Sequence, residues 1–242
     1  MLDWFALMLG NSRAHYAHFQ GRDILQTWNG QHELPEQVLL KIGQAPLVIA
    51  SVVPQQSRLW QSHPNCQIIE LKDVKLKNSY PGLGVDRALA LLGVIAHYGP
   101  PAMVIDAGTA LTISGVDASG EFVGGAILPG LGLQLKSLYN STGALPLVKI
   151  PQILPAYWAN STSEAIQSGI IHFVIAGIKD FIEQWQSRFG QSHIVFTGGD
   201  GEYLYNHFRK EKLNLKYDPN LVFMGIRELT LGSERRSQPD RT

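Results

Sequence analysis

The sequence predicts an α/β fold made of two duplicated lobes. In its first part, three strand-like segments precede alternating helices and strands, and the chain after residue 99 begins with the same order of patterns. In both parts an apolar strand is followed by a glycine turn and then by a hairpin. Such long-period similarity favours a duplicated lobe with a site between the copies over a repeat array, although common three-strand patterns can also coincide by chance. We expect lobes at 1–99 and 100–232 and a disordered tail at 233–242.

The elements of the first lobe follow from its hydrophobic pattern. An apolar strand ends at Gly10-Asn11-Ser12, and the next two strands flank a hairpin turn at Gln20-Gly21-Arg22. A helix, a buried strand, a short helix after Pro54 and a nearly all-apolar helix complete this lobe. In chain order these segments are expected at 4–9, 14–19, 23–28, 34–42, 47–52, 55–61 and 88–96.

The second lobe begins after Gly99-Pro100-Pro101. Its first strand, 102–105, is closed by Asp106-Ala107-Gly108-Thr109, and two strands then flank a turn-rich loop. The remaining expected elements are strands at 110–116, 121–128 and 194–196, a turn at 197–200 and a last helix at 220–230.

A long helix is expected from Thr162, because apolar residues keep a three-and-four spacing as far as Trp185. Gly169 and Gly177 lie near one stripe of this helix and would let another backbone approach closely. That backbone could belong to an internal neighbour or to a second subunit, and we favour the internal neighbour.

Composition limits the classes of partner. The 20 basic residues balance the 20 acidic residues, so no overall charge attracts the protein to nucleic acid or to an acidic membrane surface. Cys66 is the single cysteine, which excludes an internal disulfide and a CxxC metal site. The N-terminus lacks a basic segment, and the longest other apolar run, 88–96, is far shorter than a membrane span. We expect a soluble, cytoplasmic protein.

Two glycine turns, Gly10-Asn11-Ser12 and Gly108-Thr109, are typical of sites that bind phosphate. Glycine lets the backbone approach an anion, and successive N–H groups, hydroxyls and amides donate hydrogen bonds to it. A single turn of this kind is more often structural, but two turns, each before a hairpin, favour ATP. No Walker A motif and no GxGxxG motif opens a helix, which argues against a P-loop or Rossmann site.

Three charged residues lie at positions where they could bind a cation, accept a proton or bind a substrate. Asp106 follows a strand at the second turn, where a cation would have to bridge its carboxylate and a polyphosphate. Asp86 and Arg87 lie in the first turn of a buried helix; Asp86 could accept a hydroxyl proton while Arg87 holds an anionic substrate. The structural alternatives are a turn cap for Asp106 and a favourable helix-dipole interaction, which spacing alone favours, for Asp86.

Other motifs carry weaker signals. Gly198-Gly199 could wrap an adenine or ribose, and like Gly124-Gly125 it could be a simple bend. Thr162 could be a helix cap. The eight histidines show no metal-binding spacing, so we assign none of them as a metal ligand.

Taken in order, these motifs resemble type III pantothenate kinases over about residues 5–230. The resemblance rests on five segments: Gly10-Asn11-Ser12, Gly84-Val85-Asp86-Arg87, Asp106-Ala107-Gly108-Thr109, Gly124 to Gly130 and Thr162-Ser163-Glu164-Ala165-Ile166. It implies the two-lobed fold of actin and the sugar kinases with ATP in the cleft between the lobes. It also implies a homodimer that uses ATP and Mg²⁺ to phosphorylate pantothenate in coenzyme A synthesis.

The same resemblance implies roles for individual residues. Asp86 would be the base for the pantothenate hydroxyl, and Asp106 would hold a monovalent cation, K⁺ or NH₄⁺. The residues implied to contact pantothenate are Tyr80, Gly84, Val85, Asp86, Arg87 and Thr162. Those that we expect near ATP are Met8, Leu9, Gly10, Asn11, Ser12, Arg13, Thr109, Gly198 and Gly199.

One position departs from the family. The first turn of these kinases usually reads Asp-x-Gly-Asn-Thr, whereas this chain has Met8 in place of the Asp and Ser12 in place of the Thr. Methionine cannot bind magnesium through oxygen, so we expect weaker ATP or magnesium affinity. Met8 also keeps open a non-catalytic regulatory or accessory protein of the same fold, and fold alone does not exclude a kinase for another small hydroxyl compound.

Overall fold

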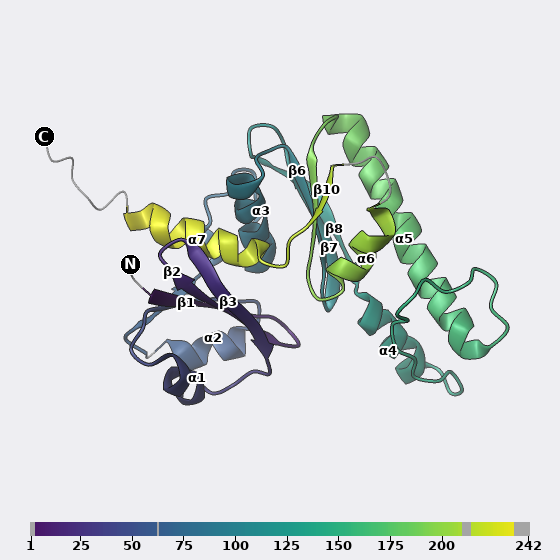
Figure 1. Ribbon diagram of the computed structural model, residues 1–242, viewed down its shortest axis with the longest axis horizontal. Helices are drawn as coiled ribbons and strands as arrows, with labels where there is room; N and C mark the ends of the chain where they lie inside the picture. The colour runs from purple at the N-terminus through teal and green to yellow at the C-terminus, as the bar shows by residue number, and fades with distance from the viewer. Residues whose placement is uncertain (1–2, 62, 210–213, 235–242) are drawn as a thin grey trace, which may run out of the picture. The chain divides into compact units, whose positions relative to one another are not determined.

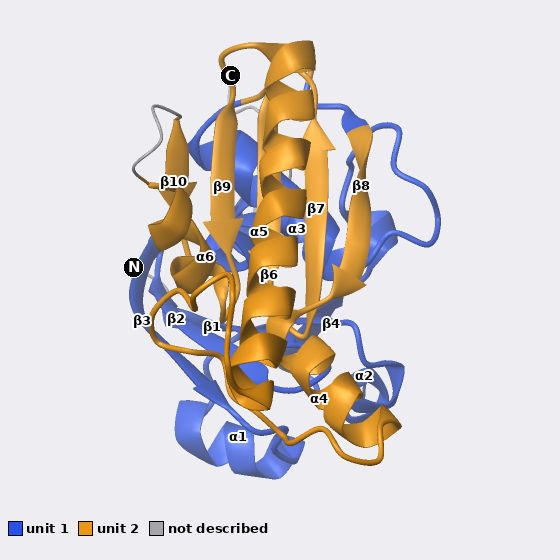
Figure 2. Ribbon diagram, turned by 90° about the vertical axis from the view of Figure 1, so that its right-hand side faces the viewer, with its two compact units in different colours: residues 1–99, 120–122, 220–242 blue, residues 100–119, 123–219 orange. Residues whose placement is uncertain are grey.

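The computed structural model describes residues 3–61, 63–209 and 214–234, which form two compact units. Unit 1 contains residues 1–99 and 120–122 and the chain from Asn220, and unit 2 contains residues 100–119 and 123–219 (Figure 2). The predicted lobes differ from these units at the C-terminus, because the last helix belongs to unit 1. That helix extends to Glu234, and residues 235–242 of the predicted tail lie outside the described residues.

Unit 1 is built on a five-stranded mixed sheet of order β3-β2-β1-β4-β5 (Figure 1). Strands β1 to β3 form an antiparallel meander, and β1, β4 and β5 are parallel. The strands are β1 (Asp3–Leu9), β2 (Ala14–Gln20), β3 (Asp23–Gly30), β4 (Leu47–Ser51) and β5 (Cys66–Ile69). The helices are α1 (Pro35–Ile42), α2 (Pro54–Trp60), α3 (Val85–His97) and α7 (Leu221–Glu234), with a short 3-10 turn at Leu71–Asp73.

The sheet of unit 1 has an apolar layer beneath α1 and α2. Alternate residues of β1, such as Leu7 and Leu9, point into this layer, as expected for a strand whose side chains alternate between the two faces. Its buried members are Leu7, Leu9, Ala14, Tyr16, Val38, Ile42, Leu47, Ile49 and Trp60.

Helix α7 joins unit 1 because two glycines allow it to approach α3 closely. A Cβ atom placed on Gly225 would lie 2.0 Å from the carbonyl oxygen of Leu89, and one on Gly93 would lie 2.1 Å from that of Leu221. Both helices also contact β4. A helix–helix contact of this kind links segments more than a hundred residues apart, so the local pattern of α7 could not assign it to a lobe.

Unit 2 repeats the plan of unit 1. Its sheet has the order β10-β9-β6-β7-β8, which is the order of the first sheet when each strand is matched to its counterpart. The strands are β6 (Ala102–Ala107), β7 (Ala110–Val116), β8 (Phe122–Pro129), β9 (His193–Thr197) and β10 (Leu215–Tyr217). The helices are α4 (Leu131–Ser141), α5 (Thr162–Phe189) and α6 (Gly201–Phe208). The predicted duplicated α/β fold is confirmed.

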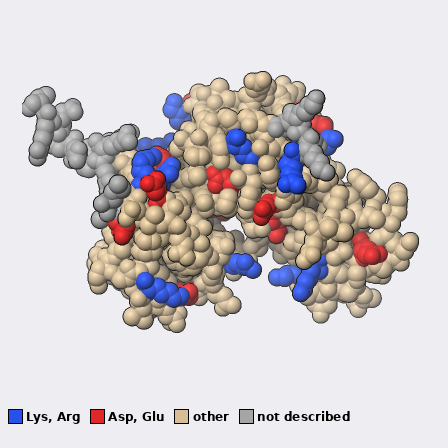
Figure 3. All heavy atoms as spheres, viewed as in Figure 1, with Lys and Arg blue, Asp and Glu red and all other residues tan. Residues whose placement is uncertain are grey.

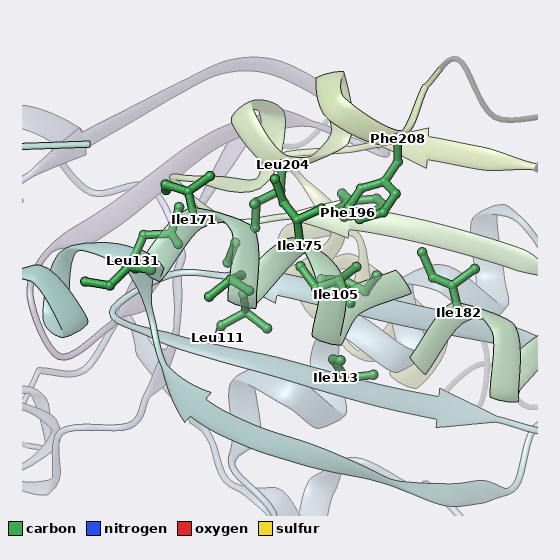
Figure 4. Packing of buried hydrophobic residues seen from close by; sticks show 14 of the residues in the cluster. Ile105, Leu111, Ile113, Leu131, Ile171, Ile175, Ile182, Phe196, Leu204 and Phe208 are labelled. Atoms are coloured by element: carbon green, nitrogen blue, oxygen red, sulfur yellow. The ribbon is translucent and has the colours of Figure 1, made fainter. Parts of the chain in front are cut away.

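The core of unit 2 lies between its sheet and α5. Ile171, Ile175 and Ile182 of α5 lie among side chains from the sheet, including Ile105 and Phe196 (Figure 4). By length and composition α5 could cross a membrane, but its buried face belongs to this core. The helix is therefore explained as the central core helix of unit 2.

The other face of α5 is apolar and exposed. Phe173 is 83% exposed, and a Cβ atom on Gly169 or Gly177 would meet nothing within 4 Å. We expected another segment of this chain to pack against these two glycines, and for the residues that the structure describes this expectation was wrong.

Charged residues mix both signs on the surface. Figure 3 shows basic and acidic side chains interspersed on the face that it displays. Within unit 1, Arg22 pairs with Glu228 at 2.5 Å and Lys41 pairs with Glu33 at 2.6 Å.

Candidate functional site

The first glycine turn connects β1 to β2 in unit 1. The N–H of Gly10 donates to the carbonyl of Arg13 at 3.0 Å, and the carbonyl of Leu9 accepts from Val52 at 3.0 Å. The carbonyl of Gly10 also accepts a hydrogen bond of 2.8 Å from Nε2 of His32. The turn is thus tied to both neighbouring strands and to the loop that follows β3.

The residues predicted around this turn differ in exposure. The side chains of Met8 and Leu9 are buried, with 6% and 2% of their surface exposed, whereas Asn11, Ser12 and Arg13 are exposed. Met8 and Leu9 can therefore offer a ligand their backbone more readily than their side chains. The donors predicted from Asn11 and Ser12 lie at the surface of unit 1, where an anion can reach them.

Asp86 lies in the first turn of α3. Gly84 is the N-cap residue and makes no side-chain cap, while Oδ1 of Asp86 accepts a hydrogen bond of 2.8 Å from the N–H of Arg87. A Cβ atom on Gly84 would lie 2.5 Å from Oδ1 of Asp86, so the motif needs glycine there. Burial raises the pKa of Asp86, while the hydrogen bond and the charge of Arg87 oppose that rise. A carboxylate with a raised pKa is a stronger base, which favours proton abstraction over a purely structural role.

Arg87 and Tyr80 lie beside this carboxylate. Arg87 is only 5% exposed, and its Nη1 donates a 3.0 Å hydrogen bond to the hydroxyl of Tyr80. The Tyr80 ring packs on Phe122, with ring centroids 5.9 Å apart. Tyr80, Asp86 and Arg87 therefore lie together, and a buried guanidinium can provide positive charge for an anionic substrate.

A pocket of about 610 Å³ opens next to Gly84 and Val85. Its other walls come from the end of β4, from α2 and from β5, and include Ser51, Trp60 and Cys66. Burial raises the pKa of the Cys66 thiol, which lowers the reactivity of this thiol. The pocket gives the first turn of α3 a concave neighbourhood within unit 1 that is large enough for a small molecule.

In unit 2 three glycine turns meet at Asp106. Gly198 has φ +87°, and a Cβ atom on it would lie 2.4 Å from Oδ1 of Asp106 and 2.6 Å from the carbonyl oxygen of Ala107. Gly130 donates through its N–H to the carbonyl of Thr109 at 2.9 Å, and a Cβ atom on it would lie 2.1 Å from the carbonyl oxygen of Gly108. The predicted residues Asp106, Thr109 and Gly198 are therefore close together.

The turn at Asp106 and the turn that follows Met8 differ in how well their residues could hold a cation. The turn at Gly198 brings Oδ1 of Asp106 and the carbonyl oxygen of Ala107 close together, and oxygen atoms of this kind suit an oxygen-binding cation. Met8 has no oxygen ligand, so the end of β1 does not fit a magnesium ion held by the protein there. Within the described ranges, no group of three or more His, Cys, Asp or Glu residues could hold a metal ion.

Thr162 is the first residue of α5 and is exposed. It is not the helix cap, because the side chain of Ser161 accepts from the N–H of Glu164 at 3.3 Å. The capping explanation for Thr162 was therefore wrong, and its hydroxyl has no capping role.

A protein-family model described as type III pantothenate kinase matches residues 5–184, more than half of the chain. The chain belongs to the type III pantothenate kinase family. The type III pantothenate kinase of Nostoc sp. strain PCC 7120 is 42% identical over an alignment of 262 positions that covers 95% of each chain. That of Synechocystis sp. strain PCC 6803 is 43% identical and covers 92% of this chain and 88% of its own.

Solved structures show the same fold in more distant proteins. A protein described as a Baf family transcriptional activator, from Campylobacter jejuni, has a TM-score of 0.67 at 24% identity, covering 96% of this chain and 99% of its own. A protein described as a 2-dehydro-3-deoxygalactonokinase, from Sinorhizobium meliloti, has a TM-score of 0.59 at 12% identity over 99% and 98%. MreB 5 of Spiroplasma citri has a TM-score of 0.50 at 10% identity over 98% of each chain. This type III pantothenate kinase family member therefore has the fold of sugar kinases and actin-like ATPases.

Two polar residues near the first turn were missed from the sequence. His15 and His32 lie beside Gly10, yet we assigned no histidine to the site because their spacing matches no metal motif. Strand pairing places His15 opposite Met8, and this pairing is the signal that could have identified it.

Proposed function

We propose that this protein transfers the γ-phosphoryl group of ATP to the primary hydroxyl of pantothenate, giving 4'-phosphopantothenate in the first step of coenzyme A biosynthesis. The observation that carries this proposal is the half-buried carboxylate of Asp86, whose pKa is raised, beside the buried Arg87 at the start of α3. Relatives 42% to 43% identical are named type III pantothenate kinases, which disfavours a non-catalytic role or another substrate. The reaction takes place in the cytoplasm.

Asp86 acts as the general base. Its carboxylate accepts the proton of the pantothenate hydroxyl as the oxygen attacks the γ-phosphorus, and the bond from that phosphorus to the bridging oxygen of ADP breaks. Arg87, held by Tyr80, binds the anionic substrate. Gly84 and Val85 line the pocket of unit 1 and contact pantothenate there. Thr162, at the start of α5 in unit 2, is the other residue that we propose for pantothenate.

ATP is bound through two sets of backbone donors and hydroxyls. In unit 1 these come from residues 8–13, with the buried Met8 and Leu9 contributing backbone only. In unit 2 they come from Thr109 and from Gly198-Gly199, the turn that closes on Asp106. Positioning and electrostatic stabilisation are what phosphoryl transfer requires of a protein, and this arrangement supplies both.

Asp106 holds the monovalent cation, K⁺ or NH₄⁺, and Mg²⁺ arrives bound to ATP. The cation supplies positive charge near the phosphates. Turnover measured across a KCl series, with NaCl keeping ionic strength constant, should rise with K⁺ in the wild type and lose this dependence in Asp106→Asn. K⁺-independent wild-type turnover would remove this role.

The catalytic test measures ADP release and the phosphorylated product with and without pantothenate. Asp86→Asn should lower kcat by roughly 10² to 10⁴ fold while ATP affinity stays close to that of the wild type. Asp23→Asn, at an exposed position at the start of β3, is the matched control and should be unaffected. Near-normal turnover in Asp86→Asn would contradict the assignment, and absence of pantothenate-dependent ADP release in the wild type would contradict the function itself.

We also propose that the protein is a homodimer formed through α5. Phe173 and Phe181 are 83% and 41% exposed on the stripe that carries Gly169 and Gly177, and both glycines leave room for another backbone. A second copy of the same helix suits such a stripe, because glycines allow two helices to approach closely. Light scattering after size exclusion should give twice the chain mass for the wild type and the single-chain mass for Phe173→Glu. A monomeric wild type at micromolar concentration would refute the dimer.

A further inference from the structure

Two imidazole rings flank the first glycine turn of unit 1. Nε2 of His32 donates a 2.8 Å hydrogen bond to the carbonyl of Gly10. Nε2 of His15 lies 3.8 Å from the position that a Cβ atom on Gly10 would occupy. Any ligand bound at this turn is therefore within reach of two nitrogen-containing rings, which come from β2 and from the loop after β3.

The ring of His15 is oriented by a neighbouring strand. His15 stands opposite Asn29 in the pairing of β2 with β3, and Nδ1 donates to Oδ1 of Asn29 at 2.7 Å. Nε2 has no hydrogen-bond partner within residues 3–61, 63–209 and 214–234. An imidazole whose one nitrogen is held by an oxygen acceptor presents the other in a fixed direction, as ligand-binding histidines usually do.

His15 also stands opposite Met8 in the pairing of β1 with β2. Residues directly opposite in an antiparallel pair project from the same face of the sheet, with Cβ atoms about 4.5 to 5.5 Å apart. Met8 is buried and His15 is half-buried, so the ring of His15 is the more accessible of these two side chains. Met8 offers no oxygen or nitrogen there, so His15 is the polar side chain of this strand pair at that position.

We propose that His15 contacts a phosphate oxygen of ATP through Nε2, and that His32 positions the Gly10 turn for the same phosphates. The proposal rests on the proposed ATP-dependent function. With Nδ1–H held by Asn29, a protonated ring offers Nε2–H to a phosphate oxygen. His15 thereby supplies a polar contact that Met8 cannot make.

The test is calorimetric binding of a non-hydrolysable ATP analogue in the absence of pantothenate, once with Mg²⁺ and once with EDTA. His15→Ala should weaken binding roughly tenfold or more, as expected for loss of a hydrogen bond or ligand to a charged group. The loss should appear in both conditions, because the contact is to a phosphate oxygen, and a loss seen only with Mg²⁺ would overturn the proposal. Unchanged affinity in both conditions would overturn the proposal.

Control variants separate contact from general damage. His97→Ala, at an exposed position near the end of α3, should bind the analogue as the wild type does. His32→Leu should weaken the analogue several-fold, and His32→Gln, which keeps a donor, should recover part of that loss. Equal weakening of pantothenate and the analogue by His15→Ala, together with a lowered melting temperature, would indicate structural damage and overturn the proposal.

The binding assay uses no pantothenate. If the wild type binds the analogue but phosphorylates no pantothenate, the proposed substrate fails while the role of His15 stands.

Discussion

Replacement of Gly198 by alanine is the sharpest test of how unit 2 is built around Asp106. At φ +87° an alanine would adopt a conformation that costs about 1–2 kcal/mol for a residue with a Cβ atom. The new methyl group would also lie 2.4 Å from Oδ1 of Asp106 and 2.6 Å from the carbonyl oxygen of Ala107. The carboxylate can rotate away, but the carbonyl belongs to the end of β6 and must move with the backbone.

The two effects set the expected magnitude. Overpacking of this kind costs about 1–3 kcal/mol, so Gly198→Ala should destabilise the protein by roughly 2–5 kcal/mol in all. This corresponds to a melting temperature lower by roughly 4–20 °C. Because Asp106 must move, the K⁺ concentration needed for half-maximal turnover should rise as well.

Gly199→Ala is the matched control in the same turn. A Cβ atom on Gly199 meets nothing within 4 Å, and its φ is not among the positive values. This variant should melt within a few degrees of the wild type and keep its K⁺ dependence. Equal melting temperatures and equal K⁺ dependence for the two variants would refute the packing argument, including the assignment of the Gly198 turn to the cation site.

Three further predictions follow from unit 1. Burial raises the pKa of Asp86 in the folded protein, so the ionised form of Asp86 destabilises the fold. Asp86→Asn should therefore raise the melting temperature at pH 7. This gain should shrink as the pH falls toward the ordinary carboxyl pKa of about 3.9. A pH-independent difference would contradict this. Gly225→Ala should lower the urea midpoint despite the higher helix propensity of alanine, because its methyl would lie 2.0 Å from the Leu89 carbonyl oxygen; an unchanged midpoint would disprove the close approach of α3 and α7. Because burial raises the pKa of Cys66, iodoacetamide should alkylate it more slowly at pH 8 than in the urea-unfolded chain, and equal rates would show an accessible thiolate.

The regular elements could largely be predicted, because their signals are local. The strand before Gly10, the two hairpins, the helix after Arg87 and the long helix from Thr162 all appear where hydrophobic periodicity and turn residues indicated them. Of the missed elements, β5, α6 and β10 are short and carry too few periodic residues to stand out from loops. Helix α4 was also missed, although its 11 residues exceed the length of the predicted α1 and α2. Their formation depends on pairing or packing with partners elsewhere in the chain.

In the candidate site, too, some residues could be proposed from the sequence, whereas their surroundings could not. Asp86 and Arg87 could be proposed from the sequence because a charged pair at the start of an apolar helix needs a reason, and Asp106 because it ends a strand at a glycine turn. The raised pKa of Asp86 and the bond from Arg87 to Tyr80 depend on burial and on side chains brought together by folding. The sequence offers no measure of either.

By itself the sequence determined the duplicated plan and the two glycine turns, since glycine, turn residues and alternating apolar positions act on the chain within a few residues. Only the tertiary structure decided which groups surround those turns. Strand register placed His15 opposite Met8, the paired glycines of α3 and α7 brought the C-terminal helix into unit 1, and Gly198 reached Asp106 from ninety residues away. These contacts join segments distant in sequence, and their energies come from packing and hydrogen bonds that no local pattern encodes.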